Sequence, residues 1–149
     1  MRIWTIGHST RTIDEFLALL RENDIELLAD IRRFPTSRWP QFKQPALRER
    51  LAAAGIEYVH LAALGGYRSG GYVAFSQTPE FATGIESLLV LAAKKRTAIM
   101  CAEAVFFRCH RRYVADALVR RGVDVEHIMG RGKLYRHVAT ERLEESRNG

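Results

Sequence analysis

The residues that could do chemistry in this chain gather in four short segments. The first is Gly7-His8-Ser9-Thr10, between a strand-like stretch and a helical one. A glycine turn lets the backbone approach a ligand, the first N–H groups of a helix favour an anion, and His8 can exchange a proton near neutral pH. The segment therefore predicts an anion-binding turn with an acid–base histidine. The alternative is a tight turn whose hydroxyls only cap the helix.

The second segment is a basic loop at residues 32–39, Arg-Arg-Phe-Pro-Thr-Ser-Arg-Trp. Guanidinium groups grip phosphate with paired hydrogen bonds, and aromatic rings stack on bases, so the loop predicts contact with a phosphate or a nucleic acid. It can equally be a solvated loop that Trp39 and Phe42 anchor to the core. The ligand-binding candidates are Arg32, Arg33, Ser37 and Arg38, with Asp30 near the end of the preceding strand.

The third segment contains both cysteines, Cys101 and Cys109. A thiolate beside arginines and a helix N-terminus is a nucleophile, which is one interpretation of this segment. The catalytic candidates are Cys101, Glu103 and His110, and the ligand-binding candidates are Cys109 and Arg111. Glu103 is either a general base or a structural partner of an arginine, and Cys101 can instead be a small buried hydrophobe.

Two familiar cysteine sites fit this segment poorly. Phosphatase-like and sulfur-transfer loops return to an arginine sooner than here, where Arg108 is the seventh residue after Cys101. A zinc site favours a compact pair such as Cys-x-x-Cys or His-x-x-x-His, and the chain has neither. We therefore expect no metal.

The fourth segment is the glycine-rich stretch 62–78. Its candidates are Gly65, Gly66, Tyr67 and Arg68. Long loops in compact domains often carry function, so the stretch predicts a flap in which Tyr67 stacks on a ligand and Arg68 clamps an anion. An ordinary surface loop is the alternative. We expect His60 and His127, which fall within strands, to be core or edge residues, and we assign no role to His137.

An alternation of strands and helices has to position these segments. We expect strands at 2–6, 26–31, 58–61, 97–101 and 123–129, and helices at 12–23, 45–55, 79–93 and 109–121. Thr12 with Glu15 forms a capping box, and Pro45 and Pro79 suit first helical turns. The alternation predicts an α/β fold, a single doubly wound, mostly parallel five-stranded sheet with helices on both faces.

All four segments follow strands of this sheet at their carboxyl ends, where open parallel sheets bind ligands. The loops at the opposite edge are short and have ordinary charge. We therefore expect the candidates to meet in one strand-end cleft.

Length and composition bound the class of protein. The chain has 149 residues, 47% of them hydrophobic and 27% charged, which is typical of one globular domain. We expect an α/β domain with the cleft at 1–132 and a charged tail or short helix at 133–149. The absence of a signal peptide and of an apolar run of ~18 residues, with only two cysteines, predicts a cytoplasmic protein with no membrane contact.

Several of these motifs together resemble one family, the prokaryotic domain of unknown function numbered 488 (DUF488). The motifs are Thr5-Ile6-Gly7-His8-Ser9, Asp30-Ile31-Arg32 with Pro35 and Ser37-Arg38, Leu64-Gly65-Gly66, Met100-Cys101-Ala102-Glu103 and Cys109-His110-Arg111. The resemblance spans roughly residues 3 to 129 and implies a small cytosolic α/β domain, without an activity. The second-strand motif more often reads Val-Asp-Val-Arg, whereas this chain has Ala29-Asp30-Ile31-Arg32.

The formal net charge of +6 indicates an anionic partner. We expect the cleft to bind a phosphorylated ligand, a nucleotide or a nucleic-acid segment, and the sequence leaves open whether a phosphoester or glycosidic bond in it is hydrolysed. A non-catalytic nucleic-acid-binding module and a thiol-based redox or sulfur-handling protein are the alternatives. The sequence identifies no cofactor and no oligomeric state.

Overall fold

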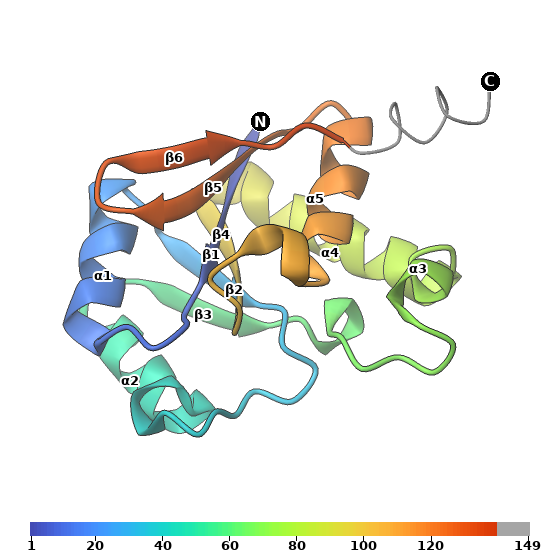
Figure 1. Ribbon diagram of the computed structural model, residues 1–149. Helices are drawn as coiled ribbons and strands as arrows, with labels where there is room; N and C mark the ends of the chain where they lie inside the picture. The colour runs from blue at the N-terminus through green and yellow to red at the C-terminus, as the bar shows by residue number, and fades with distance from the viewer. Residues whose placement is uncertain (140–149) are drawn as a thin grey trace.

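A single six-stranded sheet forms the centre of the molecule, in the order β3-β2-β4-β1-β5-β6 (Figure 1). The computed structural model describes residues 1–139, apart from the Phe107 side chain. Five strands are parallel, and they are β1 (Arg2–Gly7), β2 (Leu27–Asp30), β3 (Glu57–His60), β4 (Thr97–Cys101) and β5 (Asp124–Gly130). The predicted α/β class with a mostly parallel sheet is confirmed.

The expectation of five strands was wrong by one. Strand β6 (Lys133–Arg136) pairs antiparallel with β5 through a tight turn at Arg131 and Gly132. All four of its residues are exposed, so no alternation of buried and exposed side chains marks it as a strand. The predicted tail at 133–149 therefore begins as a sheet edge, and residues 140–149 lie outside the described part of the chain.

Helices cover both faces of the sheet, as Figure 1 shows. On one face α1 (Ile13–Glu22) and α2 (Gln44–Ala53) bury residues such as Phe16 and Leu47. On the other face α4 (Pro79–Lys94) and α5 (Arg111–Arg120) bury residues such as Ile85 and Leu118. The Thr12 hydroxyl accepts a hydrogen bond from the backbone N–H of Glu15 at 3.1 Å, so the predicted N-cap of α1 is present.

Short helical turns lie between the main elements. They are η1 (Pro40–Phe42), η2 (Ala62–Leu64), α3 (Tyr72–Phe75) and η3 (Phe106–Arg108). Two of them fall in the stretch expected to be a flexible flap, residues 62–78, which is therefore partly ordered by its own helices. No helix in the described residues is long and apolar enough to cross a membrane.

The order of the strands brings the candidate segments together. From β1 the chain crosses to β2 on one side, whereas from β4 it crosses to β5 on the other side. Strands β1 and β4 are neighbours in the sheet, so they form a switch point, which is where doubly wound sheets open a crevice. Gly7 at the end of β1 is the register partner of Cys101 at the end of β4.

Candidate functional site

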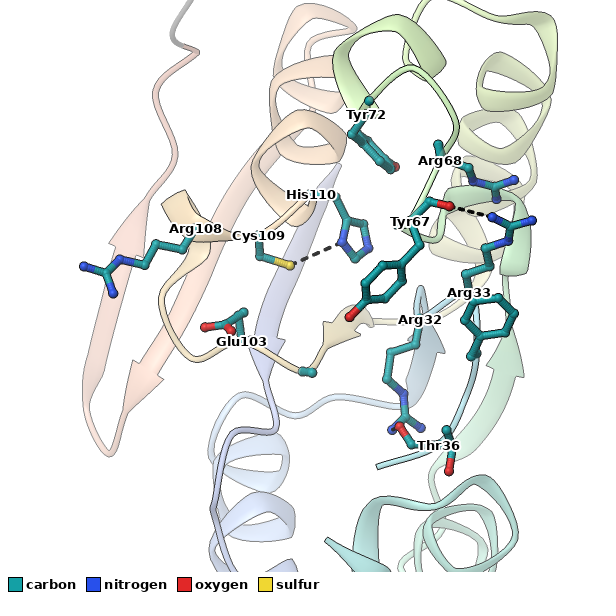
Figure 2. Close-up of a pocket in the computed structure, with 14 residues that line it drawn as sticks. Arg32, Arg33, Thr36, Tyr67, Arg68, Tyr72, Glu103, Arg108, Cys109 and His110 are labelled. Atoms are coloured by element: carbon teal, nitrogen blue, oxygen red, sulfur yellow. Dashed lines mark hydrogen bonds between the residues drawn. The ribbon is translucent and has the colours of Figure 1, made fainter. Parts of the chain in front are cut away.

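A cavity of about 480 Å³ opens at the carboxyl edge of the sheet, within the size range of small-molecule sites. The loops after β2, β3 and β4 form its walls (Figure 2). Its lining residues are Arg32, Arg33, Phe34, Thr36, Gly66, Tyr67, Arg68, Gly71, Tyr72, Ala102, Glu103, Arg108, Cys109 and His110. Segments far apart in the sequence thus share one site.

Both cysteines lie at this cavity, with their sulfur atoms 2.8 Å apart. Cys109 lines the cavity, and Cys101 is buried behind it with 1% of its surface exposed. The hydrogen bond between the two sulfur atoms, together with His110 and the backbone N–H of Arg111, lowers the pKa of Cys109 to about 4, against the effect of burial. Burial and the same hydrogen bond raise the pKa of Cys101 well above its usual value. The pKa values of the two thiols therefore shift in opposite directions, which favours the thiolate at Cys109 and the thiol at Cys101.

His110 lies beside the Cys109 sulfur, which is 3.5 Å from its Nδ1 (Figure 2). Its Nε2 is 3.0 Å from the carbonyl oxygen of Ile31, which can only accept a hydrogen bond, so Nε2 carries a proton. Nδ1 is then free to take the thiol proton or, when protonated, to donate to the thiolate. Gly66 permits this packing, because a Cβ atom there would lie 3.2 Å from Nδ1.

Arg32 has a structural role, although it borders the cavity. Its guanidinium donates to both carboxylate oxygens of Asp30, at 2.9 and 2.8 Å, and to the carbonyl of Phe42 at 2.7 Å. The Tyr58 hydroxyl donates to the same carboxylate at 2.6 Å. These bonds account for Asp30 and hold the loop after β2 in place.

Arg68 also acts on the protein itself. It donates to the carbonyls of Gly65 and Ala62, at 3.0 and 2.7 Å, and stacks over Phe75. It therefore folds the 62–78 loop. Gly65 packs tightly on the backbone of Arg33, where a Cβ atom would lie 2.3 Å from Cα. Arg111 is fully buried and lies outside the cavity lining.

The mouth of the cavity is aromatic and carries a cation. Tyr67 is 86% exposed and Phe34 57% exposed, and their ring centroids are 6.3 Å apart. The exposed Arg33 side chain joins them, because it donates to the carbonyl of Tyr67 at 2.6 Å. The guanidinium of Arg108 extends away from the cavity in Figure 2.

His8 lies in a neighbouring hollow of about 330 Å³. The residues around it are His8, Ser9, Thr10, Ser37, Arg38, Trp39, Ala102, Glu103 and Ala104. The His8 ring stacks on Phe42, and its Nδ1 donates to the carbonyl of Ser9 at 2.9 Å. Burial lowers the pKa of His8, so the imidazole is neutral. The exposed side chain of Glu103 borders both hollows.

The structure therefore divides the candidates that the sequence grouped. The cavity gathers Cys109, His110, Glu103, Gly66 and Tyr67, with Cys101 behind it. The second hollow holds His8, Ser9, Ser37 and Arg38. Among the described residues no cluster of three or more His, Cys, Asp or Glu side chains is placed to hold a metal ion.

Sequence reasoning missed one buried polar chain. His127 and His137 bond each other at 2.8 Å, His127 also bonds Thr5, and His137 Nε2 donates to the Asp116 carboxylate at 2.6 Å. Only the placement of His127 within a predicted strand could have indicated it. It lies outside the linings of both hollows.

Comparison with known proteins gave one match. The family model described as "Domain of unknown function DUF488" matches residues 12–118, which includes the cavity segments and excludes the turn after β1. Neither the curated proteins nor the solved structures gave a match.

Proposed function

The chain belongs to the DUF488 family, a domain of unknown function, and from its site we propose that it carries out thiol–disulfide exchange. Cys109 is the nucleophile and Cys101 is the resolving cysteine. One observation carries this proposal, the contact of 2.8 Å between two sulfur atoms whose pKa values shift in opposite directions. A reactive, cavity-facing thiolate beside a buried protonated thiol is the arrangement that two-step exchange requires.

The first step uses the thiolate. Cys109 Sγ attacks one sulfur of a small disulfide in the cavity, the ligand's S–S bond breaks, and one half leaves as a thiolate. A mixed disulfide now joins Cys109 to the other half of the ligand. His110 and the backbone N–H of Arg111, both 3.5 Å from the Cys109 sulfur, favour the thiolate that starts this step.

The second step uses the neighbouring thiol. Cys101 gives its proton to the departing half of the ligand and attacks Cys109 Sγ, so that the mixed disulfide breaks and a Cys101–Cys109 disulfide forms. Two electrons pass from the protein to the ligand, whose halves leave as one thiolate and one thiol. The short contact between the sulfur atoms means that this step needs little movement. Run backwards, the same steps oxidise two thiols.

The mouth of the cavity favours an anionic ligand. Arg33 is exposed there, and the net charge of the chain is +6. Carboxylate-bearing thiols and disulfides of low molecular weight fit this charge. A cysteine pair that cycles between thiol and disulfide suits the reducing cytoplasm, where we place the protein.

Glutathione disulfide is a suitable probe of the proposal. We expect wild-type protein to lose two hydrogen atoms through a Cys101–Cys109 disulfide, and Cys101→Ser to accumulate a mixed disulfide on Cys109. Cys109→Ser is the matched control and should remain unmodified at the same pH. Intact-protein and peptide mass spectrometry distinguish these products. Absence of any disulfide in wild-type protein, or equal modification of both variants, would refute the proposal.

One observation favours a second function, the binding of a nucleotide or single-stranded nucleic acid at the mouth. Phe34 and Tyr67 expose rings on which bases can stack, and Arg33 can contact a phosphate. Hydrolysis of the ligand stays a prediction. His8, the acid–base histidine expected from the sequence, lines the neighbouring hollow and not this cavity.

Fluorescence anisotropy with labelled oligonucleotides at two salt concentrations tests this second function. Salt-sensitive binding that is lost in Tyr67→Ala and Arg33→Ala but kept in Cys109→Ser would support it. Absence of binding at low salt would remove it.

A further inference from the structure

The imidazole of His110 is held by three contacts. Its Nε2 donates to the carbonyl of Ile31 at 3.0 Å, and its Nδ1 lies 3.5 Å from Cys109 Sγ. The third contact is the Tyr72 ring, whose centroid is 5.1 Å from that of the imidazole, with the two planes tilted by 45° (Figure 2). The exchange chemistry described above uses the first two contacts and gives Tyr72 no role.

The bond to Ile31 alone does not fix the direction of Nδ1. It holds Nε2, but the ring can still pivot about this atom and carry Nδ1 away from the sulfur. A ring packed against the imidazole restricts this pivot. The backbone of Gly66 closes the space beside Nδ1, because a Cβ atom there would lie 3.2 Å from it. Gly66 and Tyr72 both belong to the 62–78 loop, so this one loop encloses the imidazole.

Tyr72 is itself fixed in position. Its hydroxyl donates to the carbonyl of Leu64 at 2.7 Å. Its ring packs among three others, with centroid distances of 5.5 Å to Phe75, 6.0 Å to Phe81 and 5.6 Å to Tyr113. These contacts give the imidazole a fixed surface against which to pack.

Two groups that favour a thiolate at Cys109 do not depend on Tyr72. The Cys101 sulfur on β4 is 2.8 Å away, and the backbone N–H of Arg111 on α5 is 3.5 Å away. His110 is the third group, and its imidazole can donate to the thiolate from Nδ1 when it is protonated. Displacement of His110 therefore removes one of three contacts from the Cys109 sulfur.

The charged side chains that line the cavity are engaged elsewhere. Three guanidinium groups are bonded to the protein and a fourth extends away from the cavity, and they are Arg32, Arg33, Arg68 and Arg108. Glu103 is an exposed carboxylate at the cavity edge, and a negative charge disfavours a thiolate. Among the lining residues, His110 is thus the side chain placed to donate to the Cys109 sulfur.

We propose that Tyr72 positions His110 against Cys109, so that the 62–78 loop controls the reactivity of the nucleophile. This inference rests on the proposed exchange, in which Cys109 attacks the ligand. Tyr72 is a positioning residue, since it acts through the imidazole. An opposite charge within about 4–6 Å lowers the pKa of an acid by about 1–3 units, so a displaced imidazole leaves less thiolate at acid pH.

Tyr72→Leu tests the inference through the rate at which iodoacetamide alkylates Cys109. Because the pKa of Cys109 is about 4, the rate for wild-type protein should be nearly the same at pH 5 and pH 8. In Tyr72→Leu we expect the rate at pH 5 to fall at least about threefold below the rate at pH 8. Peptide mass spectrometry separates Cys109 from Cys101.

Three further variants identify the contact responsible. Tyr72→Phe keeps the ring beside His110 and should keep the wild-type profile. Gly66→Ala acts through its Cβ on the imidazole, because the φ angle of Gly66 is not positive, and it should reproduce the loss at pH 5. Phe16→Leu removes a fully buried ring from the core on the opposite face of the sheet and should leave the profile flat.

A flat profile in Tyr72→Leu would overturn the inference, and so would an equal loss in Tyr72→Phe or in Phe16→Leu. If Tyr72→Leu does not fold, Gly66→Ala decides in the same way. The proposed exchange fails separately, if glutathione disulfide produces no Cys101–Cys109 disulfide in wild-type protein.

Discussion

Arg32 and Arg33 are adjacent in the chain and have opposite surroundings. The Arg32 guanidinium is buried and bonded to Asp30, Thr36 and Phe42. Arg33 is exposed at the mouth of the cavity and donates to one carbonyl, that of Tyr67. The first therefore stabilises the loop, and the second is available to a ligand.

Exchange of each arginine for methionine tests this division at the residue scale. Arg32→Met leaves the buried Asp30 carboxylate without its cation, so we expect the free energy of unfolding to fall by about 3–5 kcal/mol. Arg33→Met, the matched control, should change it by less than ~0.5 kcal/mol. Urea denaturation measures both, and a small, equal effect of the two changes would contradict the assignment.

The contacts that the candidate site residues make within the protein could not be predicted from the sequence. It grouped Arg32, Arg68 and Arg111 as ligand-binding, and all three donate to backbone carbonyls of the protein. Those carbonyls belong to loops whose conformations depend on the whole fold, so spacing along the chain cannot reveal them. The contact between Cys101 and Cys109 was hidden for the same reason, since eight positions separate them and the loop determines whether they meet.

At the scale of elements, the join between β1 and β4 holds the site together. The backbone N–H groups of His8 and Ser9 donate to the carbonyls of Cys101 and Ala102, both at 2.9 Å, so the pairing continues past the strands. Gly7 makes this approach possible, because a Cβ atom there would lie 1.7 Å from the carbonyl oxygen of Glu103. Ala102 and Glu103, which follow β4 at this join, line both hollows.

Gly7→Ala should therefore force the two strand ends apart. We expect a loss of about 1–3 kcal/mol of unfolding free energy, typical of overpacking. Gly130→Ala is the control, because its Cβ would meet only Lys133 at an ordinary 3.6 Å. Thermal denaturation compares them. Similar midpoints for both variants would show that the join is not tightly packed.

Most elements could be predicted from the sequence because apolar periodicity and caps mark them. The expected strand at 97–101 and the helix beginning at Pro79 are present as predicted. Strand β6 was not predicted, because all four of its residues are exposed and no alternation of buried and exposed positions marks it in the sequence. Helix α5 begins at Arg111, after the expected start, because Cys109 is in an extended conformation.

At the scale of the whole molecule, buried neutral histidines make stability depend on pH. Burial, the charge of His137 and that of Arg111 lower the pKa of His127 to about 3 in the folded protein. In the unfolded chain the same ring titrates near 6.5. Burial lowers the pKa of His8 as well. Below pH 6.5 these two histidines therefore bind more protons in the unfolded state than in the folded state.

We expect the free energy of unfolding to be highest above pH 6.5 and to fall between pH 6.5 and about 3. Each such histidine contributes a slope of up to about 1.4 kcal/mol per pH unit. His127→Gln keeps polar groups at this position without titrating, so its slope should be smaller. Urea denaturation across this range measures the slopes, and identical slopes for wild-type and variant protein would contradict the assignment to His127.

The proposed site depends on a thiolate at Cys109, and the rate at which iodoacetamide alkylates this residue between pH 5.5 and 9 tests it most directly. Peptide mass spectrometry separates Cys109 from Cys101 in reduced, folded wild-type protein. Since the pKa of Cys109 is about 4, we expect a rate that is nearly constant across this range, with Cys101 unmodified. A rate that climbs about tenfold per pH unit up to pH 8, as for an ordinary thiol, would contradict it.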